Sequence, residues 1–224
     1  PETEVTEVRW AKPVDCLRRW EAEEVKVAPP EGTWLMEIVR TLGRCKRDKN
    51  TAATDIAERL PGRRSILFAH GVEVVPIKTA TLPPADHTNC YLVGDPDGDF
   101  VLVDPAVRMR EDMEALATAV DRHRGNLIAV LFTHSHSDHL ADMSLLKEAF
   151  DVPVWGSEYT ARSVPCQRVL TDGEQLRLGE QTWTVLITPG HHPGHSCLFS
   201  DAGLVPGDMV AGSGRRLTPP PPVS

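Results

Sequence analysis

Three histidines and a carboxylate stand within six residues near the middle of the sequence. His134, His136, Asp138 and His139 belong to the run LFTHSHSDH, which follows the apolar segment 127–132. Imidazole and carboxylate groups are the ligands that zinc and similar divalent metals prefer. Residues spaced i, i+2 in an extended chain project to the same side, so His134 and His136 can share one ion. Asp138 and His139 fall on the following turn and can serve a neighbouring ion.

Two later segments offer further ligands. The run ITPGHHPGHS carries His191, His192 and His195 in a turn punctuated by Gly and Pro. Glycines in such a turn permit the tight backbone path that lets a histidine point into a crowded site. This turn is therefore a third source of ligands, and Asp208, at the end of a predicted strand, is a candidate carboxylate.

Strands and helices alternate around these residues. The apolar periodicity indicates helices over 108–123 and 140–150. It also predicts strands at 65–69, 72–79, 89–93, 100–103, 126–132, 152–155, 167–170, 175–178, 181–187 and 196–205. Strands interleaved with helices predict a layered α/β sandwich.

The ends of the chain have a different character. Residues 1–60 predict a helical extension, with one helix starting near Pro13, another over 33–42, and a linker or loose helix over 51–60. We therefore divide the chain into this extension, a strand-rich domain over 65–214 and a proline-rich tail over 215–224.

Composition excludes several classes of protein. Of the 224 residues, 41% are apolar and 25% charged, which argues against general disorder. The net charge of −8 argues against a protein that binds nucleic acid by bulk attraction. No apolar run approaches the length of a membrane span, and no signal peptide is visible. The five cysteines form no C-x-x-C pair, so we expect reduced thiols and a cytoplasmic protein.

The three motifs together, H-x-H-x-D-H, T-P-G-H and G-D, resemble the metallo-β-lactamase-fold hydrolases over about residues 65–212. The segments HTNCYLV and VLVDP also resemble that family's first hairpin, in which the aspartate, here Asp104, is structural. The run TPGHHPGHS is similar to the glyoxalase II and β-lactamase-like-2 branch, which includes thioesterases and nucleases. The resemblance implies an αββα sandwich.

The resemblance also implies a role for each motif residue. The first metal would be bound by His134, His136 and His191, and the second by Asp138 and His139, with Asp208 bridging the two. His192 and His195 would bind neither metal, and we interpret both as donors around the ligands or as exposed turn residues. Asp138 would in addition act in catalysis by orienting a solvent molecule that ionises between the two cations and attacks the substrate. Two zinc ions are the expected cofactor, with manganese or iron as the other metals that these ligands accept.

Two departures from known families shape our expectations. The metallo-β-lactamase family completes its second metal site with a histidine beyond the G-D motif, and no histidine follows His195 here. We therefore expect a chain truncated at its C-terminus, with an incomplete second half of the sandwich. The segments RWAKPVD, WEA and VAPP are similar to the end of a Nudix hydrolase domain without its Glu-rich catalytic box; an unrelated helical extension is the alternative.

A metal-dependent hydrolase of a thioester, ester or phosphodiester is the leading hypothesis. The missing signal peptide disfavours a secreted β-lactamase, and the net charge disfavours a nuclease, so a small-molecule ester or thioester is the expected substrate. The alternatives are a metal-binding remnant without turnover, a nuclease of the same fold, and a di-iron oxidoreductase. The resemblance disfavours the last, because iron-binding relatives usually carry carboxylates in place of the middle ligands. Oligomeric state stays open.

Overall fold

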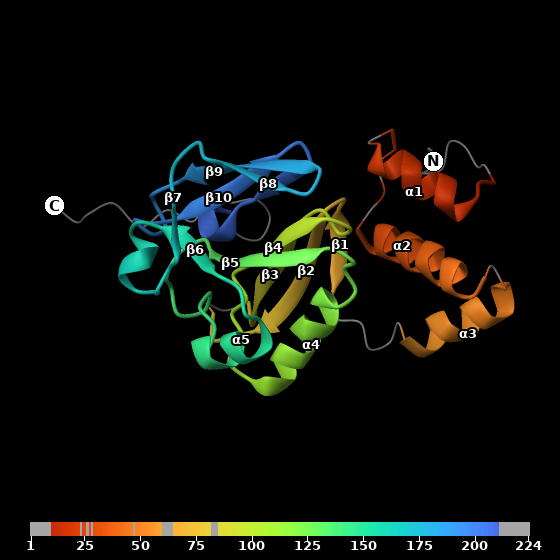
Figure 1. Cartoon of the computed structure of the whole chain (residues 1–224), viewed down its shortest axis with the longest axis horizontal. Coiled ribbons are helices and arrows are strands. Elements are labelled where there is room, and N and C mark those ends of the chain that lie inside the picture. The colour runs from red at the N-terminus through yellow and green to blue at the C-terminus, as the bar shows by residue number, and fades with distance from the viewer. Residues whose placement is uncertain are drawn as a thin grey trace, which may run out of the picture. The chain divides into compact units, whose positions relative to one another are not determined.

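The computed structural model describes residues 10–22, 24–25, 27, 29–46, 48–59, 65–81 and 85–210 (Figure 1). Contacts divide the chain into two compact units, Pro1–His70 and Gly71–Ser224. The predicted tail over 215–224 lies outside the described residues.

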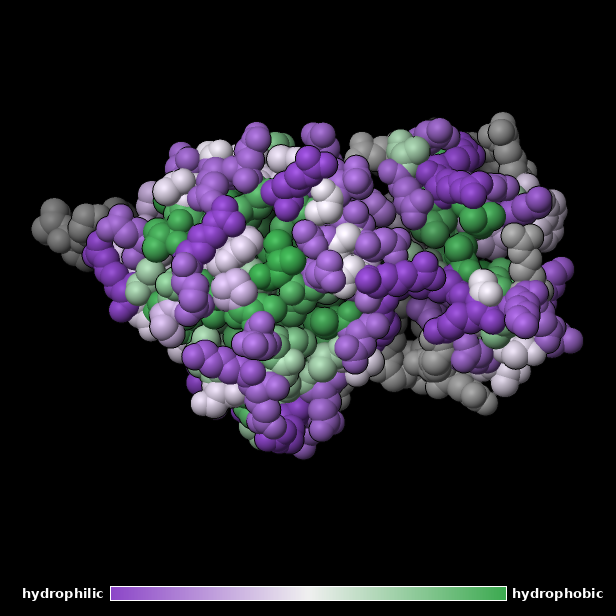
Figure 2. All heavy atoms as spheres, in the orientation of Figure 1, coloured by the Kyte–Doolittle hydropathy of each residue, from purple (hydrophilic) through white to green (hydrophobic). Residues whose placement is uncertain are grey.

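The first unit is built from helices around a small apolar core. Its elements are α1 (Pro13–Glu21), α2 (Pro29–Arg44), α3 (Lys49–Arg59) and β1 (Ile66–Ala69). The first helix begins at Pro13, as predicted, because a proline at the first helical position loses no intrahelical hydrogen bond. Leu17, Met36 and Leu67 form the core, and Figure 2 shows apolar side chains gathered between α1 and α2. The Nudix-like interpretation of this unit stays a prediction.

A mixed sheet forms the centre of the second unit. Its strands are β2 (Val72–Lys78), β3 (His87–Gly94), β4 (Asp99–Val103), β5 (Asn126–Phe132), β6 (Val154–Ser157) and β7 (Arg168–Leu170). These strands are neighbours in chain order. The pairs from β2 to β4 are antiparallel, and the pairs from β4 to β7 are parallel. Parallel strands need a crossover, and helices α4 (Arg110–Val120) and α5 (Met143–Ala149) lie in two of these connections.

The two faces of this sheet are covered by different layers. Leu102 and Phe132 point toward α4 and α5, where they share one core with Leu116 and Leu146. Their neighbours along β4 and β5 are also fully buried and, because side chains alternate, face the other way. A second, antiparallel sheet in the order β11-β10-β9-β8 lies there, and β8 contacts β4. Its strands are β8 (Gln175–Leu178), β9 (Gln181–Ile187), β10 (Ser196–Ser200) and β11 (Gly203–Val205).

Two expectations are corrected by the structure. The single strand expected over 196–205 is a hairpin, because the chain turns before Gly203, whose φ of +140° suits glycine. The helix expected over 140–150 starts later, because the Asp142 side chain caps it by accepting hydrogen bonds from two backbone N–H groups. In the described part of the second unit, the α-helices are α4 and α5, and the layers are helix, sheet and sheet; the αββα sandwich with an incomplete second half stays a prediction.

The core supports a prediction about stability. Leu116 of α4 is fully buried against the mixed sheet. Leu116→Ala should therefore lower the free energy of unfolding by about 2–5 kcal/mol, because apolar burial is lost and a cavity is left behind. Urea titration followed by circular dichroism measures this. Met109→Ala is the control, because Met109 is 59% exposed and should cost less than about 0.5 kcal/mol. Equal losses in the two variants would contradict the assigned core.

Candidate metal centre

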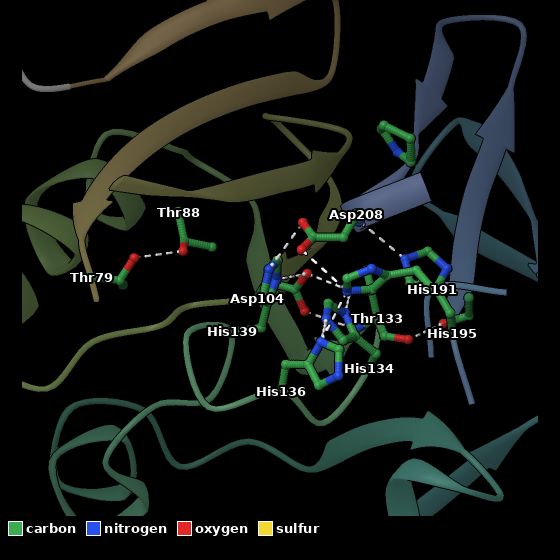
Figure 3. A network of polar contacts seen from close by, with 12 residues as sticks. Thr79, Thr88, Asp104, Thr133, His134, His136, His139, His191, His195 and Asp208 are labelled. Atoms are coloured by element: carbon green, nitrogen blue, oxygen red, sulfur yellow. Dashed lines mark hydrogen bonds and ion pairs between the residues drawn. The ribbon is translucent and has the colours of Figure 1, made fainter. Parts of the chain in front are cut away.

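Four chain segments meet at one edge of the stacked sheets. Asp104 follows β4 and His134 follows β5, and the carboxyl ends of parallel strands lie at the same edge of a sheet. The loop after β9 brings His191, and the short helical turn η3 (Gly207–Met209) after β11 brings Asp208. Figure 3 shows these side chains pointing toward one another, with Asp208 between His139 and His191.

The first predicted ligand cluster is present as three convergent imidazoles. His136 Nδ1 lies 3.1 Å from His134 Nε2 and 2.9 Å from His191 Nε2. Two imidazole nitrogens bound to one tetrahedral zinc, each at about 2.0–2.1 Å, are about 3.3 Å apart. The three nitrogens therefore have the separation that a shared ion requires.

The second cluster combines a histidine with two carboxylates. Asp138, His139 and Asp208 offer ligand atoms that lie within 4.8 Å of one another. Asp208 Oδ1 lies 3.1 Å from His139 Nε2, while Asp208 Oδ2 lies 3.4 Å from His191 Nε2. One oxygen of Asp208 thus faces each cluster. The structure brings together all six residues that the sequence proposes for the metal site: His134, His136, Asp138, His139, His191 and Asp208.

Asp104 orients two of these histidines. Its buried carboxylate accepts hydrogen bonds from Thr133 N at 2.7 Å, Thr133 Oγ1 at 2.5 Å and His139 Nδ1 at 3.0 Å. His139 therefore presents Nε2 to the site. Because the Thr133 hydroxyl donates to Asp104, it accepts from His134 Nδ1 at 3.0 Å, and His134 also presents Nε2. Asp104 lies within ligand distance of these histidines, but its oxygens are occupied by the three donors.

The two clusters differ in their charge. Burial lowers the pKa of His139, but the charge and hydrogen bond of Asp104, with those of Asp208, outweigh it and raise the pKa to about 10. Burial and the neighbouring histidines hold the pKa of His134 far below its usual value. Burial also lowers the pKa of His191, although Asp208 opposes this. Without a metal, the second cluster therefore holds a proton, whereas His134 and His191 stay neutral, which is the form that binds metal.

His195 holds the Asp208 turn in place. Its Nε2 accepts a hydrogen bond from Asp208 N at 3.1 Å, so its protonated Nδ1 donates to Thr188 Oγ1 at 2.8 Å. The side chain is fully buried, and burial lowers its pKa to about 4, which keeps it an acceptor at neutral pH. Gly207 has φ +50°, and a Cβ there would lie 2.5 Å from His195 Nε2. Glycine is thus required for this close approach.

His192 supports a different part of the centre. Its Nδ1 accepts a hydrogen bond from Gly194 N at 3.1 Å, so its Nε2 donates to Ser135 Oγ at 3.2 Å. Ser135 stands in the sequence between two of the predicted ligands, His134 and His136. The sequence left two alternatives for His192 and His195, donors around the ligands or exposed turn residues, and the structure shows both side chains buried beside the ligands. Their spacing after His191 is a signal for such a role, but the atoms that each one contacts depend on the packing of the two sheets.

Comparison with known proteins identifies the family. A sequence model of the Metallo-beta-lactamase superfamily matches residues 83–223. The chain belongs to this superfamily. Among solved structures, a beta-lactamase domain protein from Burkholderia ambifaria has a similar fold, with a TM-score of 0.55 and 24% identity over 69% of this chain and 59% of that one. ETHE1 from Myxococcus xanthus has a TM-score of 0.50 and 25% identity over 62% of this chain and 58% of that one.

Relatives within the superfamily are longer than the matched region. A hydroxyacylglutathione hydrolase from Yersinia pestis is 32% identical over 142 residues, which are 61% of this chain and 53% of that protein. An uncharacterised protein from Aquifex aeolicus is 29% identical over 143 residues, 54% of this chain and 65% of that protein. The chain thus spans between about half and two thirds of these relatives. In the described part, no helix is long and apolar enough to cross a membrane; the cytoplasmic location and the truncation stay predictions.

The charge distribution predicts how stability depends on pH. In metal-free protein, His139 contributes stability that is complete below its unfolded pKa of about 6.5 and is lost as pH rises through about 10. His195 has the opposite effect on stability, because its side chain takes up a proton below about pH 6.5 in the unfolded chain but only near pH 4 in the folded protein. Its contribution to stability is therefore lost as the pH falls from about 6.5 to 4. Urea midpoints from pH 4 to 10 should therefore peak near neutrality. His139→Gln should reduce the alkaline loss; an unchanged alkaline limb would contradict the assigned His139–Asp104 pair.

The His195 contact predicts a coupled pair of variants. His195→Leu and Gly207→Ala should each displace Asp208 and weaken the second metal by about 10–100-fold while the first stays bound. Zinc titration calorimetry of metal-free protein measures both sites. His195→Gln, which can retain an acceptor for Asp208 N, is the matched control and should lose less. Unchanged affinity in all three variants would show that the contact does not position Asp208.

Proposed function

We propose that this chain is a zinc-dependent hydrolase that cleaves a thioester or ester of a small molecule at a two-metal centre. The observation that carries the proposal is the placement of Asp208, with one carboxylate oxygen toward each ligand cluster. A carboxylate in that position can bind two ions at once and set the distance between them. The name of the Yersinia relative, hydroxyacylglutathione hydrolase, favours an acyl derivative of a thiol as the substrate.

The residues present fit two metal ions. His134, His136 and His191 would hold the first through the nitrogens that already converge. Asp138 and His139 would hold the second, and Asp208 would be shared by both. Three imidazoles in one cluster and a mixture of imidazole and carboxylate in the other are typical donors for zinc, and manganese or iron are the alternatives that such donors allow.

The chain's own groups prepare the centre for hydrolysis. Bound zinc ions supply a water that loses its proton near neutral pH and a Lewis acid that polarises the carbonyl group. Asp138 lies in the second cluster, where its carboxylate can accept a hydrogen bond from the attacking water and orient it. Asp104 keeps the His139 ring in one orientation, and His195 keeps the Asp208 backbone in place. Ligands held this way need little reorganisation during the reaction.

Metal content and turnover test the proposal together. Zinc-loaded protein should hydrolyse S-lactoylglutathione, measured as the release of free thiol. His136→Ala should lose the first metal, because only two imidazole ligands remain, while Asp208→Ala should retain at least one metal and lose turnover by about 100-fold or more. His87→Ala is the matched control, since this histidine is exposed and pairs with Asp86 outside both clusters.

Four outcomes would contradict parts of this assignment. Wild-type zinc content in dialysed His136→Ala protein would exclude His136 as a ligand. Full activity of Asp208→Ala would exclude its bridging role. Tight zinc binding with no hydrolysis of thioesters, oxyesters or phosphodiesters would favour the metal-binding remnant, whereas cleavage of phosphodiesters alone would favour a nuclease.

A further inference from the structure

Arg108 is held in place at its backbone and at its guanidinium group. Arg108 follows Ala106 and Val107, which are fully buried in the loop between β4 and α4. The carbonyl oxygen of Val107 accepts a hydrogen bond from Asp142 N at 2.7 Å, which fixes the backbone. At the other end, the guanidinium donates a hydrogen bond to the main-chain oxygen of Ser137. The charge of Arg108 is therefore held in one place.

That place is the loop that carries the metal ligands. Ser137 stands between His136, in the first cluster, and Asp138, in the second. The guanidinium therefore contacts the segment that joins the two clusters. One of its hydrogen-bond donors is used in this contact, and a guanidinium has five. The remaining donors are available to a ligand, since Arg108 is exposed.

Arg108 also differs from its neighbours in its charge pairing. Arg110, two residues further on, pairs with Glu148 through contacts of 3.2 and 3.3 Å, and Arg162 pairs with Glu158 at 3.5 Å. For Arg108, no carboxylate among the described residues lies within ion-pair distance. Its guanidinium thus has no ion-pair partner in the described part of the chain, although the full sequence carries a net charge of −8.

Such a cation is suited to an anionic substrate. A chain of net negative charge repels anions in general, so an anionic substrate needs a local positive group at the site. The planar guanidinium fork matches the geometry of a carboxylate and forms strong charge-assisted hydrogen bonds with it. A guanidinium already ordered by Ser137 loses less freedom when it binds such a group.

We propose that Arg108 is a substrate-binding residue that selects thioesters carrying a carboxylate. This inference rests on the proposed hydrolase function and names the substrate class of the same site. The carboxylate can belong to the acyl group or to the leaving thiol, and the substrates of the test distinguish the two.

Charge-matched substrates test the proposal. The anionic substrates are the acetyl thioester of 3-mercaptopropionate and the succinyl thioester of methyl 3-mercaptopropionate, and the neutral reference is the acetyl thioester of methyl 3-mercaptopropionate. For the wild-type zinc protein, kcat/KM should be higher for at least one anionic substrate than for the reference. Arg108→Gln, whose amide can still donate to Ser137, should lower that selectivity ratio by about tenfold, mainly through KM.

The matched control is Arg110→Gln. It removes the same charge two residues away, from a side chain already paired with Glu148, and should leave the ratio within about twofold of wild type. If Arg108→Gln lowers kcat/KM for all three thioesters equally, Arg108 only positions the ligand loop and the proposal is wrong. An unchanged ratio in Arg108→Gln, or equal losses of the ratio in both variants, would also overturn it.

A binding measurement separates this proposal from the proposed function. If wild-type protein hydrolyses neither S-lactoylglutathione nor any of these thioesters, the thioesterase assignment fails, and ligand-observed NMR with zinc-loaded protein still tests Arg108. The probes are N-acetyl-β-alanine, an uncleaved amide counterpart, and its methyl ester. Preferential binding of the acid to wild type and Arg110→Gln but not to Arg108→Gln would support the anion site. Equal binding in all three proteins would overturn it.

Discussion

The buried carboxylate of Asp104 is the interaction on which the metal centre depends. An ionised carboxylate that is 1% exposed is costly unless its oxygens are satisfied. Here Thr133 supplies its backbone N–H and its hydroxyl, and His139 supplies Nδ1. These contacts join the end of β4 to the end of β5 and to the turn beyond it. The orientations of His134 and His139 follow from this one buried group.

The same charge arrangement explains how the centre can be built before a metal arrives. Asp104 and Asp208 flank His139 and favour its protonated form, so a proton supplies positive charge between the two carboxylates. The neighbouring imidazoles of His134 and His191 remain neutral because they are buried near other histidines. A divalent ion that binds at His139 therefore replaces a proton, whereas an ion at the histidine cluster finds ligands that are already deprotonated.

Both sheets contribute to the positions of these groups. The parallel strands β4 and β5 end beside each other and supply Asp104 and the histidine-rich turn. The second sheet supplies the His191 loop and the Asp208 turn. His195, at the end of that loop, accepts a hydrogen bond from Asp208 N and so connects the two segments. Asp208 consequently reaches both clusters from the opposite sheet. Arg108 belongs to the same edge, and its guanidinium contacts the turn that joins the two clusters.

The sequence by itself determined the ligand types, their spacing and most of the elements that carry them. His134 and His136 fall on one side of an extended segment because side chains alternate, and the buried strand before them was recognisable from its apolar run. Tertiary structure alone decided that Asp208 faces both clusters and that His195 rather than His192 holds it. It also decided that Arg110 pairs with Glu148, whereas Arg108 has no carboxylate partner among the residues that the structure describes. These features depend on contacts between segments that are far apart in the chain. Strand pairing and the packing of one sheet on the other set the distances between those segments, so the features cannot be predicted from the local sequence pattern.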